Sequence, residues 1–248
     1  MTQEKILILL RAIPEKSHKH GDTVCVVGLN TRLEWRRLYP FIFQQALKFK
    51  KRNVLWTELT PPNSKQDKRY ESRKVINHYL AYKKQVPDNK VKEILQKIKN
   101  HSVQELKEKN ASLGVITPQM RDIKITIEST RVTNPQLKIL WGKAPTVGQE
   151  EFKKLPIKVS YIFTCEESAN CSCSKNPHKF QLLDWEVNEL FRNLVKREGD
   201  NKKIIAEKMK EKFFDWMINE RDLYLILGTH NWYKTWMVIG IFYPKKEF

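Results

Sequence analysis

The sequence predicts an α+β fold: an N-terminal antiparallel β unit completed by later strands, a basic helical insert, a Cys/His loop, two helices and a C-terminal β-hairpin. Two observations support this prediction. Residues 1–60 contain short apolar, β-branched runs separated by polar turns, as strands do. Residues 91–98 and 187–195 instead space their apolar side chains three and four apart, which indicates amphipathic helices.

Four strands are expected in the N-terminal β unit, which covers residues 1–60. The runs that define them are 5–12, 23–29, 33–40 and 53–59. A polar turn joins the second and third runs, which predicts a hairpin. The strands are expected to form a curled sheet or a partial barrel, with Cys25 as a small core residue.

A basic helical insert is expected at residues 61–118, after a loop that contains Pro and Ser. Residues 75–82 and 91–98 each place apolar side chains on one helix face. A third helix is expected to begin at Ser102, because Ser102 and Glu105 have the spacing of a capping box.

Residues 119–180 are expected to complete the β core and to contain a metal site. Strands are expected at 122–128, at the run "LKILW" and at 157–163. Three thiols and an imidazole then follow and can complete a tetrahedral zinc shell, which leaves no open position for water or substrate. A structural zinc ion is therefore predicted, with a local disulfide or free thiols as alternatives. The four predicted ligands are Cys165, Cys171, Cys173 and His178.

Residues 181–248 are expected to form two helices and a closing hairpin. The first helix begins at Asp184, whose side chain can cap it, and ends near Gly199. The second helix spans 205–217. Two apolar runs joined by the loop "THNWYK" predict the hairpin.

The charge of the chain is strongly positive and unevenly distributed. The 248 residues include 46 Lys and Arg against 28 Asp and Glu, a net charge of +18. Residues 1–180 contain 34 of the basic and 17 of the acidic side chains, whereas residues 181–248 are nearly balanced. Because basic surfaces release counterions from polyanions, we expect a nucleic-acid-binding protein, with DNA favoured over RNA and little base specificity.

Two segments combine cations with aromatic rings, as single-stranded nucleic acid sites do. In "EWRRLYP", strand alternation sends Arg36 and Arg37 to opposite faces, so at least one is expected to face solvent. In "THNWYK", Trp232 and Tyr233 occupy the turn of a hairpin. The predicted nucleic-acid-binding residues are Arg36, Arg37, Lys68, Arg69, Arg73, Trp232, Tyr233 and Lys234.

Two alternatives to simple binding remain. Asp184, Glu186 and Glu189, with Asp122 or Glu128, are candidate ligands of a metal-dependent nuclease. The second alternative is an interaction subunit of a larger nucleic-acid-processing or defence complex, with a protein partner. The P-loop and common hydrolase motifs are absent, so whether the protein is an enzyme stays undecided.

A cytoplasmic location is expected, without a membrane partner or a small-molecule cofactor. The apolar run Ile6–Leu10 is far shorter than the roughly 20 residues that span a bilayer. The four Cys residues do not have the pattern of a disulfide scaffold, which is consistent with a reducing compartment.

Several motifs along the chain resemble those of a family of uncharacterised bacterial and archaeal proteins. The resemblance covers most of the chain and implies the same domain order and a Cys/His module, but no activity. The motifs are "TVCVVG" at 23–28, "EWRRLYP" at 34–40, "DKRYES" at 67–72, "SLGVITP" at 112–118, the cluster at 165–178, "DWE" at 184–186 and "GIFYP" at 240–244.

Overall fold

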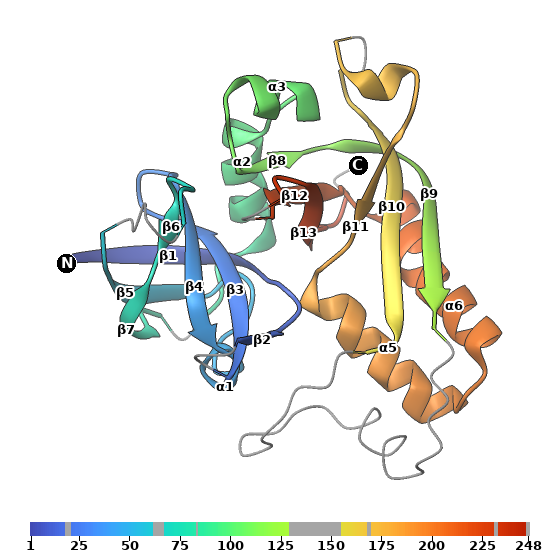
Figure 1. Ribbon diagram of the computed structural model, residues 1–248, viewed down its shortest axis with the longest axis horizontal. Helices are drawn as coiled ribbons and strands as arrows, with labels where there is room; N and C mark the ends of the chain where they lie inside the picture. The colour runs from blue at the N-terminus through green and yellow to red at the C-terminus, as the bar shows by residue number, and fades with distance from the viewer. Residues whose placement is uncertain are drawn as a thin grey trace.

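Two bodies lie side by side in the protein (Figure 1). The structure is a computed structural model and describes residues 1–17, 21–61, 67–82, 84–128, 155–167, 170–230 and 233–246. Within these ranges the predicted α+β fold is confirmed, because an N-terminal sheet lies beside two smaller sheets and their helices. None of the described helices is long and apolar enough to cross a membrane.

The N-terminal body is a sheet of seven strands in the order β6-β4-β3-β1-β5-β7, with β2 paired to β3. Neighbouring strands are antiparallel except β4 and β6, which are parallel. The four strands predicted in residues 1–60 are confirmed as β1, β3, β4 and β5. The bounds are β1 Thr2–Arg11, β2 Glu15–Ser17, β3 Gly21–Leu29, β4 Trp35–Ile42, β5 Val54–Leu59, β6 Ser72–Arg73 and β7 Val75–Leu80.

This sheet curls, so that β4 and β7, which are far apart in the strand order, approach each other. The Phe41 ring on β4 lies 4.5 Å from the His78 ring on β7, centroid to centroid. Ile6 and Ile8 of β1 point into the interior with Leu38 of β4, because alternate residues of a strand share a face. We call this body the curled barrel.

The helix predicted at residues 75–82 is wrong. Val75–Leu80 forms strand β7, which pairs antiparallel with β5 and places Tyr79 opposite Trp56. β-branched and aromatic residues fit a pleated, half-buried surface, and pairing with β5 satisfies the backbone on one side of the strand. The i, i+4 and i+7 spacing of apolar residues in this segment is therefore coincidental.

The described residues of the first half of the chain contain three short helices, α1 Phe43–Ala46, α2 Asp88–Ile98 and α3 Val103–Glu108. The helix predicted at 91–98 and the one that begins after Ser102 are confirmed. Ser102 Oγ accepts a 3.1 Å hydrogen bond from the Glu105 backbone N–H. The Glu105 carboxylate accepts one of 2.7 Å from the His101 N–H, so the capping box closes one residue before the N-cap.

The second body has two three-stranded sheets, in the orders β11-β10-β9 and β13-β12-β8. The predicted strands at 122–128 and 157–163 and the closing hairpin are confirmed, and β8 was not predicted. The run "LKILW" lies outside the described residues. The bounds are β8 Leu113–Ile116, β9 Pro118–Ile127, β10 Ile157–Cys165, β11 His178–Gln181, β12 Tyr224–Thr229 and β13 Trp236–Phe242.

Helices α5, α6 and α7 pack against these sheets in one apolar core. As predicted, Asp184 caps α5 by accepting a 2.9 Å hydrogen bond from the Glu186 N–H. The helix ends at Gly199, whose φ of 62° suits glycine. The bounds are α5 Trp185–Glu198, α6 Lys202–Lys210 and α7 Trp216–Glu220, with a π-helical turn at Glu211–Asp215 between the last two.

One apolar cluster joins the two bodies. It contains Leu10 of β1, Val91 and Leu95 of α2, and Ile239 of β13. The strands approach closely here, since a Cβ on Gly240 would lie 2.5 Å from a Leu10 side-chain carbon. The bodies therefore share a core, and the outer face of β1 is covered. Cys25 packs against the same cluster but is only partly buried.

Candidate functional site

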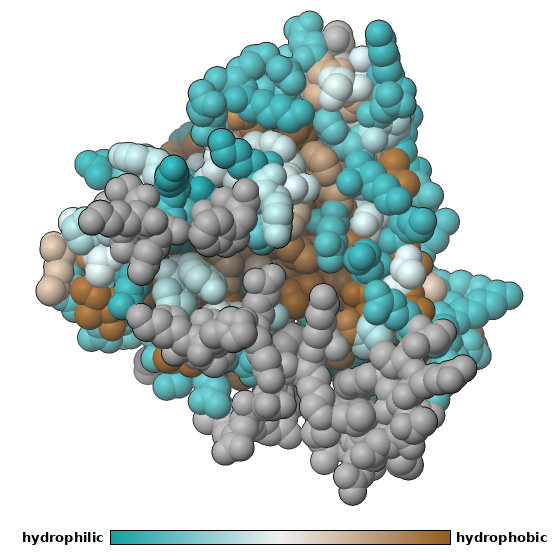
Figure 2. Space-filling view, in the orientation of Figure 1, coloured by the Kyte–Doolittle hydropathy of each residue, from teal (hydrophilic) through white to brown (hydrophobic). Residues whose placement is uncertain are grey.

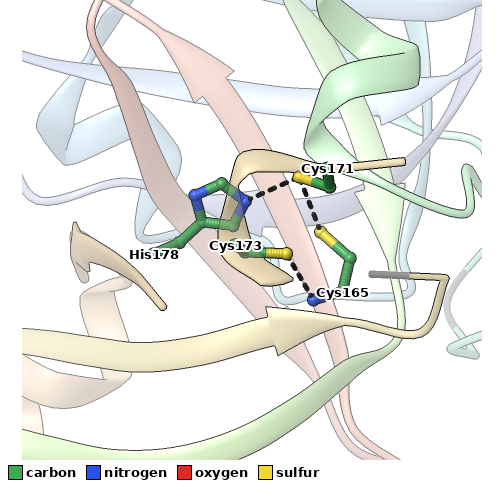
Figure 3. A group of neighbouring side chains, drawn as sticks. All are labelled: Cys165, Cys171, Cys173 and His178. Atoms are coloured by element: carbon green, nitrogen blue, oxygen red, sulfur yellow. Dashed lines mark hydrogen bonds between the residues drawn. The ribbon is translucent and has the colours of Figure 1, made fainter. Parts of the chain in front are cut away.

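The predicted Cys/His ligands converge at one end of the β10–β11 hairpin (Figure 3). Cys165 is the last residue of β10 and His178 is the first of β11. Cys171 and Cys173 lie at a 3-10 turn, Ser172–Ser174, between these strands. Their four ligand atoms all lie within 4.8 Å of one another.

The distances between these atoms suit a tetrahedral metal ion. Cys165 Sγ lies 3.8 Å from Cys171 Sγ, and Cys171 Sγ lies 3.2 Å from His178 Nε2. Zinc bonds of about 2.3 Å to sulfur and about 2.0 Å to nitrogen give tetrahedral edges of about 3.8 Å and about 3.5 Å. A disulfide needs sulfurs about 2.05 Å apart, so the described structure has free thiols.

The site is closed to solvent. The exposed fractions of Cys165, Cys171, Cys173 and His178 are 0%, 5%, 1% and 9%. The Phe180 ring stacks on the imidazole at 5.1 Å. A metal ion bound here would have four protein ligands and no access for substrate, which is the arrangement of structural zinc sites.

Backbone N–H groups support the sulfur atoms. Val103, at the start of α3, donates to Cys165 Sγ at 3.3 Å, and Cys165 donates to Cys173 Sγ at 3.3 Å. Such donors stabilise negative charge on sulfur, and outer contacts of this kind orient metal ligands. The site therefore links the hairpin to α3.

Burial, hydrogen bonds and a nearby charge set the pKa values of the four candidate ligands. Burial raises the pKa of the Cys165 and Cys173 thiols. At Cys171 burial has the same tendency, but hydrogen bonds, first from the Cys173 N–H, outweigh it and lower the pKa. Burial and the Lys107 charge lower the pKa of His178, so its imidazole is neutral and able to bind a metal. Metal binding at this site must displace thiol protons.

Two protein families match the chain. Domain of unknown function (DUF8757) matches residues 92–248, and Domain of unknown function (DUF8758) matches residues 2–100. The first match covers more than half of the 248 residues. The chain belongs to the DUF8757 family. A search of the curated proteins finds no match for it.

The DUF8757 match contains all four Cys/His ligands and the second body, whereas the DUF8758 match contains the curled barrel. The two matches overlap at residues 92–100, most of which belong to α2, the helix that packs against both bodies. The resemblance to an uncharacterised family is thus confirmed. The candidate metal site is a property of the DUF8757 part.

The predicted solvent exposure of Arg36 or Arg37 is wrong, because both are only 3% exposed. Arg36 donates to Glu4 at 2.7 Å through Nε and to Glu34 at 2.7 Å through Nη2. Arg37 donates to Glu71 at 3.2 Å through Nε and to the Ser112 carbonyl at 3.0 Å through Nη2, so it lies on the side of β4 that meets the second body. Both faces of β4 are covered here, one by the barrel interior and the other by the second body.

Arg69 and Arg73 are also used internally. Arg69 binds the Asp67 carboxylate at 2.6 Å and donates to the Thr229 carbonyl at 3.0 Å. Arg73 is 9% exposed and donates to the Tyr70 carbonyl at 2.6 Å. We call Arg36, Arg37, Arg69 and Arg73 the arginine cluster.

The other predicted binding residues are exposed or lie outside the description. Lys68, Tyr233 and Lys234 are exposed, Tyr233 by 79%. Trp232 lies outside the described residues. The hydrogen bond from Arg69 to the Thr229 carbonyl places the loop that contains Lys68 against the end of β12, where the β12–β13 turn begins.

The acidic nuclease candidates do not form a metal site in the described ranges. Asp184 is fully buried, and its carboxylate accepts hydrogen bonds of 2.8 Å from both Lys51 Nζ and the Ile241 N–H. Lys51 also pairs with Glu186 at 3.0 Å. Burial raises the pKa of Asp184, and Lys51 lowers that of Glu186 against the effect of its burial. Asp184 and Glu186 thus form ion pairs with Lys51 where the two bodies meet.

Sequence reasoning missed a groove on the curled barrel. It has a volume of about 540 Å³ and lies between β4 and β7, with α1 and Lys48 at one end. Strand β7 forms one wall of this groove, and a helix prediction for residues 75–82 does not lead to such a wall. The β-branched and aromatic residues of that segment are the sequence signal that favours a strand.

Proposed function

We propose that the protein binds one Zn²⁺ through Cys165, Cys171, Cys173 and His178, and that the folded, zinc-stabilised chain binds nucleic acid without base specificity. The observation that best supports zinc is the convergence of four ligand atoms within 4.8 Å, in a buried site. Three thiolates with an imidazole are a donor set that suits zinc.

The proposed role of the ion is structural. A bound Zn²⁺ would fasten the 3-10 turn to the ends of β10 and β11, and through Cys165 to the Val103 N–H of α3. Zinc binding to small zinc-finger peptides contributes about 10 to 16 kcal/mol, which becomes folding free energy. We expect loss of metal to loosen this end of the hairpin and α3 first.

Metal analysis tests this role. Protein purified without chelator should contain one zinc per chain, and Cys173→Ser should lose most of it. Cys25→Ser is the matched control, since Cys25 lies in the curled barrel and should keep a full zinc content. Equal zinc content in both variants, or none in the wild type, would contradict the proposal.

The proposal of nucleic acid binding rests on charge. Residues 1–180 contain twice as many basic as acidic side chains, and a surface of this kind attracts phosphates. Because the arginine cluster is occupied internally, the proposed contacts are exposed lysines, among them Lys48, Lys74, Lys84, Lys90 and Lys97.

A binding assay with labelled single- and double-stranded DNA and RNA tests this part. If six to ten phosphates are contacted, affinity should fall about 10³- to 10⁵-fold between about 50 and 200 mM salt. An affinity independent of salt would remove the electrostatic basis. Cleavage of the probes on addition of Mg²⁺ or Mn²⁺ would favour the nuclease alternative instead.

A further inference from the structure

The groove between β4 and β7 lies where the curled barrel fails to close. Pro40, Phe41 and Ile42 of β4 form one wall and Val75–Leu80 of β7 forms the other. β6 pairs only with Arg37 and Leu38, so within the described residues the end of β4 has no strand on this side. β7 pairs with β5 alone among the described strands.

Apolar side chains are exposed along this opening. Ile42, Ile76, Tyr79 and Leu80 are 46%, 47%, 60% and 42% exposed. Figure 2 shows apolar residues reaching the surface at the left of the view, over the N-terminal body. Exposed apolar residues around one groove are typical of binding surfaces in folded proteins.

An aromatic platform stands at the edge of the groove. The Tyr79 ring stacks on Trp56 at 6.5 Å, with 21° between the ring planes. Lys5 Nζ lies 5.6 Å from the Trp56 ring and 5.4 Å from the Tyr82 ring. The platform combines flat aromatic faces with a positive charge, and bases stack on such faces.

The charge within the groove is positive. Lys48 and Lys74 line it, both are exposed, and none of its lining residues is Asp or Glu. Neither lysine forms an ion pair with a carboxylate in the part of the chain that the structure describes. These charges are therefore available to an anionic ligand, unlike those of the arginine cluster.

We propose that this groove binds single-stranded nucleic acid, with bases against Tyr79 and the apolar walls and phosphates at Lys48 and Lys74. The assignment rests on the proposed nucleic acid binding and adds the site and the strandedness. A single strand offers unstacked bases to apolar walls, whereas a duplex presents mainly phosphates at its surface. Binding should therefore favour single strands.

A fluorescence anisotropy titration with labelled oligo(dT) of about 12 nucleotides tests the lysines, since single-strand sites span about 4 to 16 nucleotides. The double variant Lys48→Glu with Lys74→Glu should bind at least about 10-fold more weakly, and its salt slope should fall by about 1 to 2. The matched control is Lys196→Glu with Lys203→Glu. These exposed lysines of α5 and α6 give the same change in net charge, and affinity should change less than about 2-fold.

A second pair of variants tests stacking. Tyr79→Ala should weaken binding about 5- to 100-fold, because loss of one stacked base has an effect of this size. Tyr70→Ala, which removes a similarly exposed ring from the loop before β6, should have little effect. Both variants should stay folded, since both rings are mainly exposed.

The outcomes separate this inference from the general proposal. If the groove and control variants lose affinity equally while the wild type binds, the groove assignment is wrong and nucleic acid binding stands. If the wild type binds no probe at low salt, both are wrong. If an oligo-glutamate peptide of equal charge competes as well as unlabelled oligo(dT), the groove binds an extended acidic peptide, and the nucleic acid assignment is overturned.

Discussion

The arginine cluster and the groove lysines lie on the same curled barrel but use their charge in opposite ways. Arg36 and Arg37 are 3% exposed, and carboxylates hold their guanidinium groups. Lys48 and Lys74 are exposed and line a groove without acidic side chains. The rigid fork of arginine suits buried carboxylate pairs, whereas lysine keeps its ammonium group hydrated. Net charge alone therefore does not locate a binding surface.

The largest difference between the two regions is expected in the free energy of unfolding of substituted variants. Arg37→Ala should lower the free energy of unfolding by about 3 to 5 kcal/mol, because the buried Glu71 carboxylate loses its partner. Lys48→Ala should change it by less than about 0.5 kcal/mol, as exposed substitutions do. Urea denaturation of both variants measures the difference. Equal stabilities would show that Arg37 is not a structural residue.

A smaller, pH-dependent effect is expected at Asp67. Burial alone would raise the pKa of Asp67, but hydrogen bonds from Arg69 and Ser72 outweigh it and hold the pKa below its usual range. The carboxylate therefore stabilises the fold above its unfolded pKa of about 3.9, and this contribution is lost as the pH falls through the lower folded value.

Asp67→Asn should accordingly lower the free energy of unfolding by about 1 to 2 kcal/mol at neutral pH. The difference in free energy of unfolding between wild type and variant should become smaller as the pH falls below about 4. Thermal unfolding between these pH values measures this difference. A difference that stays constant with pH would mean that the ion pair to Arg69 contributes nothing.

The smallest expected effect concerns the groove itself. Burial and the Lys48 charge lower the pKa of His78. The folded state then favours the neutral ring, so stability should be highest above the unfolded pKa of about 6.5 and should decrease as the pH falls below it. Lys48→Met should flatten this decrease, whereas Lys196→Met should not. Unfolding curves from pH 8 to pH 5 compare the two variants, and identical slopes would contradict a charge at Lys48 acting on His78.

Features whose parts are close in sequence could be predicted. The four candidate metal ligands lie within one loop, and the three thiols and one imidazole between Cys165 and His178 already predict a tetrahedral metal site. The caps at Ser102 and Asp184 likewise depend on neighbouring residues. The strands of residues 1–60 were predicted because their apolar runs match strand length.

Features that depend on distant partners could not be predicted. Arg36 meets Glu4 from another strand, and no local signal reveals that pair. Lys51 and Asp184 are 133 positions apart in the chain. The sequence predicts a helix for strand β7 because the periodicity of a short segment is ambiguous, whereas pairing with β5 decides its conformation. With that strand misassigned, the groove could not be predicted.

Hydrogen exchange with and without oligo(dT) is the most direct test of the contrast between the two cation-rich regions. Amides of β7, of the end of β4 and of α1 should gain protection when the oligonucleotide binds, because they line the groove. The segment that contains Arg36 and Arg37, already buried and hydrogen-bonded, should change little. Protection confined to the 67–72 loop and the β12–β13 turn, with none in β7, would contradict the account.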